Sequence, residues 1–226
     1  MSLPFTTEQF LDVFRRYNEA VWPAQWALVA IAVTAIAYST LGRPHTGRRV
    51  SALLALLWLW MAVAYHLAFF ATINRAAVLF AVAFVAQAAL FAWVSVHPRQ
   101  LELKPRKDAT GLAGAVFVFY ALVGYPALGW ALGHRYPTAP TFGVPCPTTI
   151  FTFGLLLWCV RPVPWRLLAI PTLWALVGTS AALSLGMIED FALPVAAVVT
   201  VSIAITSRHR VRWHSAAAHP SLRTCP

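Results

Sequence analysis

The stretch Gly124–Val160 reads GYPALGWALGHRYPTAPTFGVPCPTTIFTFGLLLWCV. An apolar segment ends within it, a loop rich in proline and glycine follows, and a second apolar segment begins at Pro145-Cys146-Pro147. Apolar segments joined by short polar loops are typical of proteins whose helices cross a lipid bilayer. The stretch therefore predicts an all-α, polytopic membrane bundle.

The composition of the whole chain agrees with this prediction. Of 226 residues, 60% are hydrophobic and only 11% are charged, against about 25% charged in an ordinary soluble domain. The available polar residues cannot cover so much apolar surface, so we expect the lipid bilayer to be the main partner. The formal net charge is +10, but the basic residues lie between apolar segments, where membrane topology places them. Nucleic-acid binding is therefore not expected.

Seven apolar segments are expected to form transmembrane helices. They lie near 22–41, 50–72, 76–96, 111–132, 147–160, 165–186 and 191–206. Most reach the ~20 residues that a bilayer crossing needs. The fifth, 147–160, is short, and the sequence leaves open whether it spans or is re-entrant, although spanning is favoured. A re-entrant backbone is tolerated only where protein or water covers it.

The N-terminal segment is expected to be an amphipathic interfacial helix. Thr6 and Gln9 have the spacing of a capping box, and apolar residues then recur at helical intervals through Tyr17. Acidic residues such as Glu8 and Asp12 argue against a signal peptide. We therefore divide the chain into an interfacial helix at 1–21, a transmembrane domain at 22–206 and a basic, disordered cytoplasmic tail at 207–226.

The basic residues predict an orientation. One set of alternate loops, with the tail, holds thirteen of them: Arg43, Arg48, Arg49, Arg99, Lys104, Arg106, Lys107, Arg161, Arg166, Arg208, Arg210, Arg212 and Arg223. The other side holds four: Arg15, Arg16, Arg75 and Arg135. Cytoplasmic loops carry the excess of Lys and Arg. We expect the N-terminus outside, the C-terminus in the cytoplasm, and the protein in a bacterial inner membrane.

Polar side chains that could form a binding pocket gather at the predicted outer end. The residues expected to bind a small solute are His66, Asn74, Arg75, Tyr125, Thr148 and Thr149. The start of the segment at Pro147 leaves helix N–H groups unpaired and carries partial positive charge, so an anion or a carbonyl oxygen is the expected ligand. His66 lies inside a span, where a polar side chain either serves a function or bonds one neighbouring group.

A metal site is a second expectation for the same end. Cys146, His134 and His66 are acceptable ligand types for zinc or copper, but their separations in sequence establish no geometry. A lone cysteine between prolines is more often a small packing residue than a ligand. Glu189 and Asp190 are expected at a solvated turn. They could also bind a cation there, or pair with Arg75.

Three functions stay open at this level. The leading hypothesis is binding or transport of a small solute through an outward-facing polar pocket. The first alternative is a membrane-embedded enzyme that uses Cys146 or a metal bound by His and Cys. The second is a structural or accessory membrane subunit. The sequence does not define a cofactor.

Four stretches resemble a family of uncharacterised bacterial integral membrane proteins that is known as a domain of unknown function. They are Pro4–Phe10, Tyr17–Pro23, His66–Phe70 with Ile73-Asn74, and Phe142–Thr152. The resemblance covers most of the chain to about Thr206. It implies a membrane location and brings no activity with it.

Overall fold

The computed structural model describes residues 4–42, 45–97 and 101–217, with side chains described as far as residue 208. Within these residues the chain is helical and has no named strand, which confirms the all-α prediction. The α-helices are α1 Thr7–Ala20, α2 Ala24–Thr40, α3 Thr46–Trp60, α4 Ala77–Val96, α5 Ala109–Phe119, α6 Tyr125–Ala131, α7 Pro145–Leu157, α8 Trp165–Leu185 and α9 Ala192–Ala217.

Short segments of other helix types extend or join these helices. The π-helix Met61–Leu67 and the 3-10 helix Phe70–Thr72 continue α3. The π-helix Tyr120–Gly124 joins α5 to α6, and the 3-10 helix Ile188–Phe191 precedes α9. Pro126 has no N–H to donate, so the regular hydrogen-bond ladder is interrupted next to Tyr120–Gly124.

Five helical segments of the described chain are long and apolar enough to cross a membrane: Thr46–Thr72, Ala77–Val96, Ala109–Ala131, Trp165–Leu185 and Ile188–Arg208. The other two expected segments are also helical but shorter. Helix α2 has 17 residues and forms an 89° bend with α1, and the two would make a sixth candidate as one broken span. Helix α7 has 13 residues. Length and composition alone therefore support five or six spans rather than the predicted seven.

Helix α7 lies at the centre of the bundle. Every residue of the helix except Cys146 is buried. It packs closely along α5 because two glycines meet: a Cβ added to Gly154 would lie 2.8 Å from the carbonyl oxygen of Gly114. The Trp158 Nε1–H donates to the carbonyl oxygen of Gly111 at 3.0 Å and ties the far end of α7 to α5. The protein itself covers this short helix, as a membrane interior requires.

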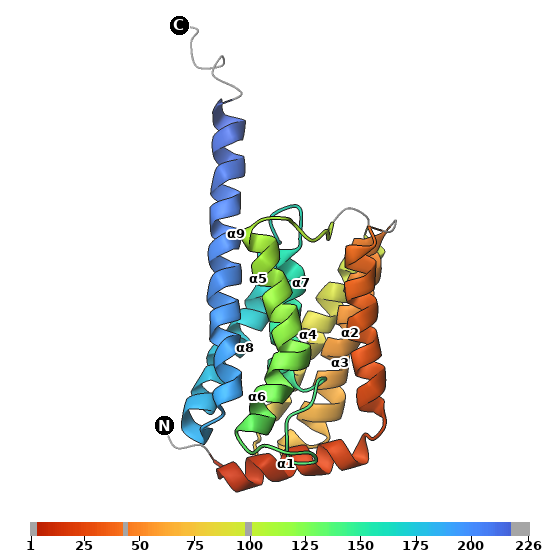
Figure 1. Ribbon diagram of the computed structural model, residues 1–226, viewed down its shortest axis with the longest axis vertical. Coiled ribbons are helices and arrows are strands. Elements are labelled where there is room, and N and C mark those ends of the chain that lie inside the picture. Colours follow the sequence, from red (N-terminus) through yellow and green to blue (C-terminus); the bar gives the residue numbers. More distant parts are fainter. Residues whose placement is uncertain (1–3, 43–44, 98–100, 218–226) are drawn as a thin grey trace, which may run out of the picture.

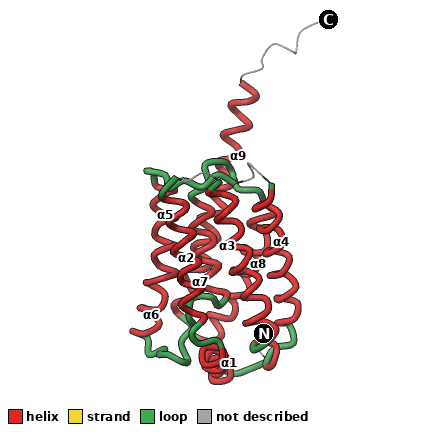
Figure 2. The backbone as a smooth tube through the Cα atoms, turned by 90° about the vertical axis from the view of Figure 1, so that its right-hand side faces the viewer, coloured by secondary structure: helices red, strands yellow, loops and turns green. Residues whose placement is uncertain are grey.

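Helix α1 lies across one end of the bundle, and α9 extends beyond the other (Figure 1). Seen from the side, α1 runs beneath the ends of the long helices (Figure 2). Its bounds and its Thr6–Gln9 capping box agree with the prediction. Its apolar face, however, packs on the protein rather than facing lipid, because Phe10, Phe14 and Tyr17 join a buried cluster with residues of the bundle.

The predicted disordered tail needs correction over its first part. Helix α9 continues to Ala217, eleven residues past the predicted boundary at Thr206. The sequence from Ser207 to Ala217 contains neither glycine nor proline, so nothing in it interrupts the helix. Residues 218–226 lie outside the described residues, as do Arg43 and Arg99.

The outer surface is apolar along the helices and aromatic at both ends. Leu79, Leu112 and Leu176 are among the exposed leucines on the helix faces. Exposed tryptophan and tyrosine side chains at the α1 end include Trp22, Trp26, Trp130 and Tyr136, and those at the opposite end include Trp93 and Trp165. Tryptophan and tyrosine are enriched at the two interfaces of a membrane, so this surface fits a protein that spans one.

Candidate functional site

Helix α1 closes the end of the bundle over an aromatic cluster. Phe14 stacks against Tyr65 with ring centroids 5.8 Å apart, and Phe10 meets Phe70 edge-on at 6.0 Å. Tyr17 is fully buried and accepts a hydrogen bond from Trp60 Nε1 at 2.7 Å. The periodicity that makes α1 amphipathic therefore positions its aromatic side chains inside the protein.

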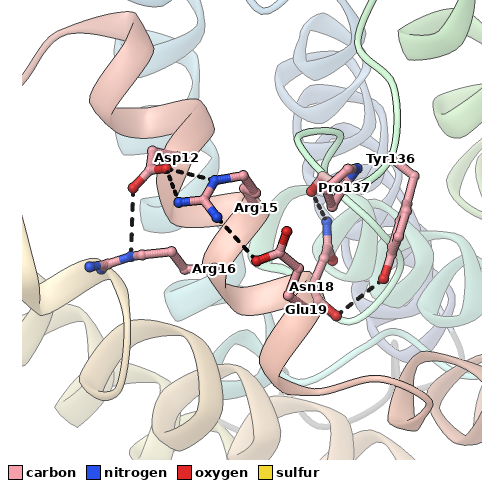
Figure 3. A network of polar contacts seen from close by, with 7 residues as sticks. All are labelled: Asp12, Arg15, Arg16, Asn18, Glu19, Tyr136 and Pro137. Carbon is pink, nitrogen blue, oxygen red and sulfur yellow. Dashed lines mark hydrogen bonds and ion pairs between the residues drawn. The ribbon is translucent and has the colours of Figure 1, made fainter.

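The polar face of α1 carries surface ion pairs. Arg15 contacts Asp12 at 2.6 Å and Glu19 at 3.1 Å (Figure 3). Asn18, which is buried, donates to the carbonyl oxygens of Pro137 and Ala139 at 2.7 and 2.8 Å. This contact fixes the α6–α7 loop against the C-terminal turn of α1.

A cavity of about 110 Å³ lies directly beneath α1. Its walls come from α1, the end of the α3 segment, α4, α6, the start of α7, α8 and the turn before α9. The side chains and backbone that line it belong to Phe5, Phe10, Phe14, Tyr65, Phe70, Asn74, Phe80, Tyr125, Val144, Pro145, Cys146, Trp174, Val177, Gly178, Ser180, Ala181 and Asp190. Most of this lining is apolar, and its one acidic group is Asp190.

Two adjacent carboxylates are buried at this end. Glu189 is 0% exposed and Asp190 is 4% exposed. The Tyr125 hydroxyl donates to Asp190 Oδ1 at 2.6 Å, and His134 Nδ1 lies 2.6 Å from Glu189 Oε1. The Tyr120 hydroxyl donates to the carbonyl oxygen of Glu189 at 2.8 Å. The expectation that Glu189 and Asp190 occupy a solvated turn is therefore wrong, because the π-helix Tyr120–Gly124, α6 and the α6–α7 loop cover them.

The fold explains how these groups come together. Gly186 ends α8 in the left-handed conformation, at φ 73°, which a residue with a side chain rarely adopts. The chain then forms the 3-10 turn Ile188–Phe191 and enters α9. On the facing helix, Tyr120 is the first residue of the π-helix and Tyr125 directly follows it. Such π-helical turns are frequent at functional sites.

Cys146 is the partly exposed residue at the start of α7, and it lines the cavity together with Asp190 and Trp174. The buried Trp174 Nε1–H has no hydrogen-bond partner among the described residues. A Cβ added to Gly178 would lie 3.6 Å from the Cys146 sulfur and 3.8 Å from Trp174 Nε1. The absence of a side chain at Gly178 thus leaves space at this corner of the cavity.

His66 is fully buried behind the cavity wall. Its ring centroid lies 4.6 Å from that of Phe84, 5.2 Å from that of Trp174 and 5.8 Å from that of Phe80. Neither ring nitrogen has a hydrogen-bond partner among the described residues. The single partner expected from the sequence is therefore not found, and an aromatic shell surrounds the imidazole instead.

The structure places the remaining predicted solute-binding residues in different environments. Asn74 lines the cavity, but its Oδ1 accepts from the Ala76 N–H at 3.0 Å. Arg75 is exposed. Thr148 accepts from the Gly143 N–H at 3.1 Å, and the buried Thr149 hydroxyl has no partner among the described residues.

The start of α7 offers little to an anion. Pro145 and Pro147 have no N–H, the Thr148 N–H points to the Val144 carbonyl oxygen at 3.4 Å, and the nearest buried charges are carboxylates. The local chemistry thus favours a hydrogen-bond donor or a cation over the predicted anion.

The predicted metal set receives no support from the geometry. In the part of the chain that the structure describes, no group of three or more His, Cys, Asp or Glu side chains could hold a metal ion. His134 contacts Glu189, Cys146 contacts Asp190, and His66 lies among aromatic rings.

Comparison with known families identifies the chain. A family model described as a family of unknown function, DUF6064, matches residues 7–215. The chain belongs to this family. Searches among curated proteins and among solved structures each find no match. The match confirms the resemblance to a family of unknown function. The function of this DUF6064 member therefore has to be argued from its own residues.

Sequence reasoning missed several residues of the cavity. Phe10, Phe14 and Trp174 read as ordinary apolar positions of amphipathic or membrane helices. What distinguishes them is their convergence on one space, and that depends on where α1 and α8 pack.

Proposed function

We propose that this DUF6064 protein is a multi-pass membrane protein that binds a small solute in the cavity beneath α1. The observation that carries the proposal is the cavity of about 110 Å³, which has aromatic walls and the buried carboxyl of Asp190 at one side. A concave, mainly apolar pocket with a few converging polar groups is the usual form of a small-molecule site.

The apolar surface supports a placement in the membrane. In this proposal seven helices, α7 included, cross the bilayer, and the α1 end faces the outside. Arg48, Arg106, Arg161 and Arg166 lie at the opposite end, as the excess of basic residues on a cytoplasmic side requires. Reporter tags fused at Met1 and Pro226 should then respond in different compartments, and signals from one common compartment would contradict this topology.

Helix α1 is the part of the proposed site that has to move. It contributes Phe10 and Phe14 to the cavity and covers the end of the bundle. In this proposal a solute that arrives from outside displaces part of this cover. In this proposal α1 is therefore a lid, and passage of the solute across the membrane would be a further step.

The native thiol of Cys146 provides a direct test. In a variant with Cys159→Ala and Cys225→Ser, methyl methanethiosulfonate should label Cys146 in the folded protein, because the thiol lines the cavity. The reference is the same variant unfolded in dodecyl sulfate, where the Cys146 thiol is fully exposed. No labelling of Cys146 in the folded protein would contradict an accessible cavity.

A further inference from the structure

We infer that the cavity selects a small organic cation, an ammonium group of about the size of trimethylammonium, with Asp190 as its counter-ion. The inference rests on the proposed function and adds the charge and size of the solute. Three features carry it: the aromatic walls, the unpaired carboxylate and the volume.

The walls are aromatic on several sides. Phe10, Phe14, Tyr65, Phe70, Phe80 and Trp174 all line the cavity. Neighbouring rings contact one another, with centroids 5.8 Å apart for Tyr65 and Phe70 and 5.4 Å apart for Phe80 and Trp174. Aromatic faces attract cations through their quadrupole, and cages of such rings bind quaternary ammonium groups. The same rings would give an anion no comparable attraction.

Asp190 supplies a carboxyl group at the same cavity. The residue is 4% exposed, and the Tyr125 hydroxyl, a neutral donor, donates to its Oδ1 at 2.6 Å. Among the ion pairs of the described residues, none includes Asp190. A buried charge ordinarily has a counter-ion, so a cationic ligand would complete this site.

The surrounding groups leave that charge largely uncompensated. Glu189 has His134 as its own partner. Asp190 lies at the start of α9, where a helix N-terminus contributes roughly half a positive charge. Tyr65, Tyr120, Tyr125 and Cys146 are the other titratable groups near Asp190, and each is neutral when it holds its proton. An ionised Asp190 therefore has no counter-ion of its own among the described residues.

The basic side chains of this end are engaged elsewhere. Arg15 pairs with Asp12 and Glu19, and Arg16 donates to Thr72. The guanidinium of Arg135 lies over Trp130, 4.9 Å from its centroid. Arg75 is exposed and does not line the cavity. None of these basic side chains therefore occupies the cavity, which leaves the cavity free for a cationic ligand.

The volume limits the size of the ligand. The cavity measures about 110 Å³, and a dry cavity of about 150 Å³ in another protein holds one benzene molecule. A trimethylammonium group is compact enough for such a space, whereas a larger ligand would require α1 to move away.

The test compares two probes of nearly equal shape. Choline carries a quaternary nitrogen, and 3,3-dimethylbutan-1-ol has carbon in its place and no charge. Each is titrated by calorimetry into the full-length protein in lipid nanodiscs. We expect choline to bind at least about tenfold more tightly than the neutral alcohol, which corresponds to about 1.4 kcal/mol. Asp190→Asn should remove that preference, whereas Asp12→Asn, at an exposed acid of α1, should leave it unchanged.

The outcomes separate the inference from the proposed function. Equal affinity for both probes would overturn the cationic ligand and leave the solute pocket in place. Binding of neither probe, with Cys146 still labelled, would likewise overturn the cation and leave the cavity accessible. If Cys146 is not labelled, the proposed function itself fails. The comparison of probes in the wild-type protein decides the question even if Asp190→Asn does not fold.

Discussion

Carboxylates at the α1 end of this protein occupy two different environments. On the outer face of α1, Asp12 and Glu19 are about half exposed and pair with Arg15 (Figure 3). Beneath α1, Asp190 is buried and lacks a basic partner among the described residues. The first arrangement neutralises charge within the helix itself, and the second leaves a carboxyl group facing a cavity. Under our proposal the outer acids stabilise a surface, and Asp190 binds a ligand.

The largest expected effect comes from truncating an aromatic side chain of α1 that lies between the two environments. Phe14→Ala should lower the free energy of unfolding by about 3–5 kcal/mol, because a buried aromatic side chain is lost. It should also speed labelling of Cys146. Arg15→Ala, one position along on the exposed face, is the matched control. Urea titration in detergent micelles measures the first effect, and equal losses in the two variants would contradict the buried packing of α1.

Two tyrosine variants allow a hydrogen bond to a carboxylate to be compared with a hydrogen bond to a backbone carbonyl. Tyr125→Phe removes the hydroxyl that donates to the Asp190 carboxylate, and a hydrogen bond to a charged group contributes about 1.5–3 kcal/mol. Tyr120→Phe removes a hydroxyl that donates to the Glu189 backbone carbonyl, and we expect a loss of about 1 kcal/mol. Both losses come from the same unfolding titrations. A larger loss for Tyr120→Phe would argue that Asp190 carries no charge.

Among the side-chain contacts of α1, the exposed ion pairs should contribute least to the free energy of unfolding. A double-mutant cycle between Arg15 and Asp12 should give a coupling of less than about 1 kcal/mol, because exposed ion pairs are screened by water and ions. The coupling should fall further in 1 M salt, where the screening length is about 3 Å. A coupling that is larger and insensitive to salt would remove the distinction between the two environments.

Asp108, at the other end of the bundle, should make a small contribution to the pH dependence of stability. The Gly111 N–H donates to Asp108 Oδ1 at 2.9 Å, and this bond, together with Arg106, lowers the pKa of Asp108 below its usual 3.8. The folded state therefore binds this proton less readily than the unfolded state. The resulting stabilisation is present above pH 3.8 and is lost as the pH falls through the lower folded pKa. Asp108→Asn should flatten this part of the stability profile, and an unchanged profile would contradict the assignment.

Much of the fold could be predicted from the sequence because it depends on local properties. Length and hydropathy locate the apolar helices, and the Thr6–Gln9 capping box locates the start of α1. Proline at position 126 marks a disturbed helix. The other π-helix, Met61–Leu67, contains no proline to mark it, and its sequence predicts a continuous α-helix.

The site was less predictable because its contacts join distant segments. Tyr125 and Asp190 lie 65 positions apart, and His134 and Glu189 lie 55 apart. Two acids after Gly186 have the local pattern of a solvated turn, and only packing against α6 and the α6–α7 loop buries them. The role of α1 as a cover likewise depends on tertiary packing, since its amphipathic pattern fits a lipid surface equally well.

The most direct test of the central claim is a crystal structure of the protein with tetramethylarsonium, an arsenic analogue of tetramethylammonium that anomalous scattering locates. The account predicts an arsenic peak inside the cavity, among Phe10, Trp174 and Asp190. A peak only beside the exposed Asp12 or Glu19, or a cavity filled by side chains with no peak at all, would contradict it.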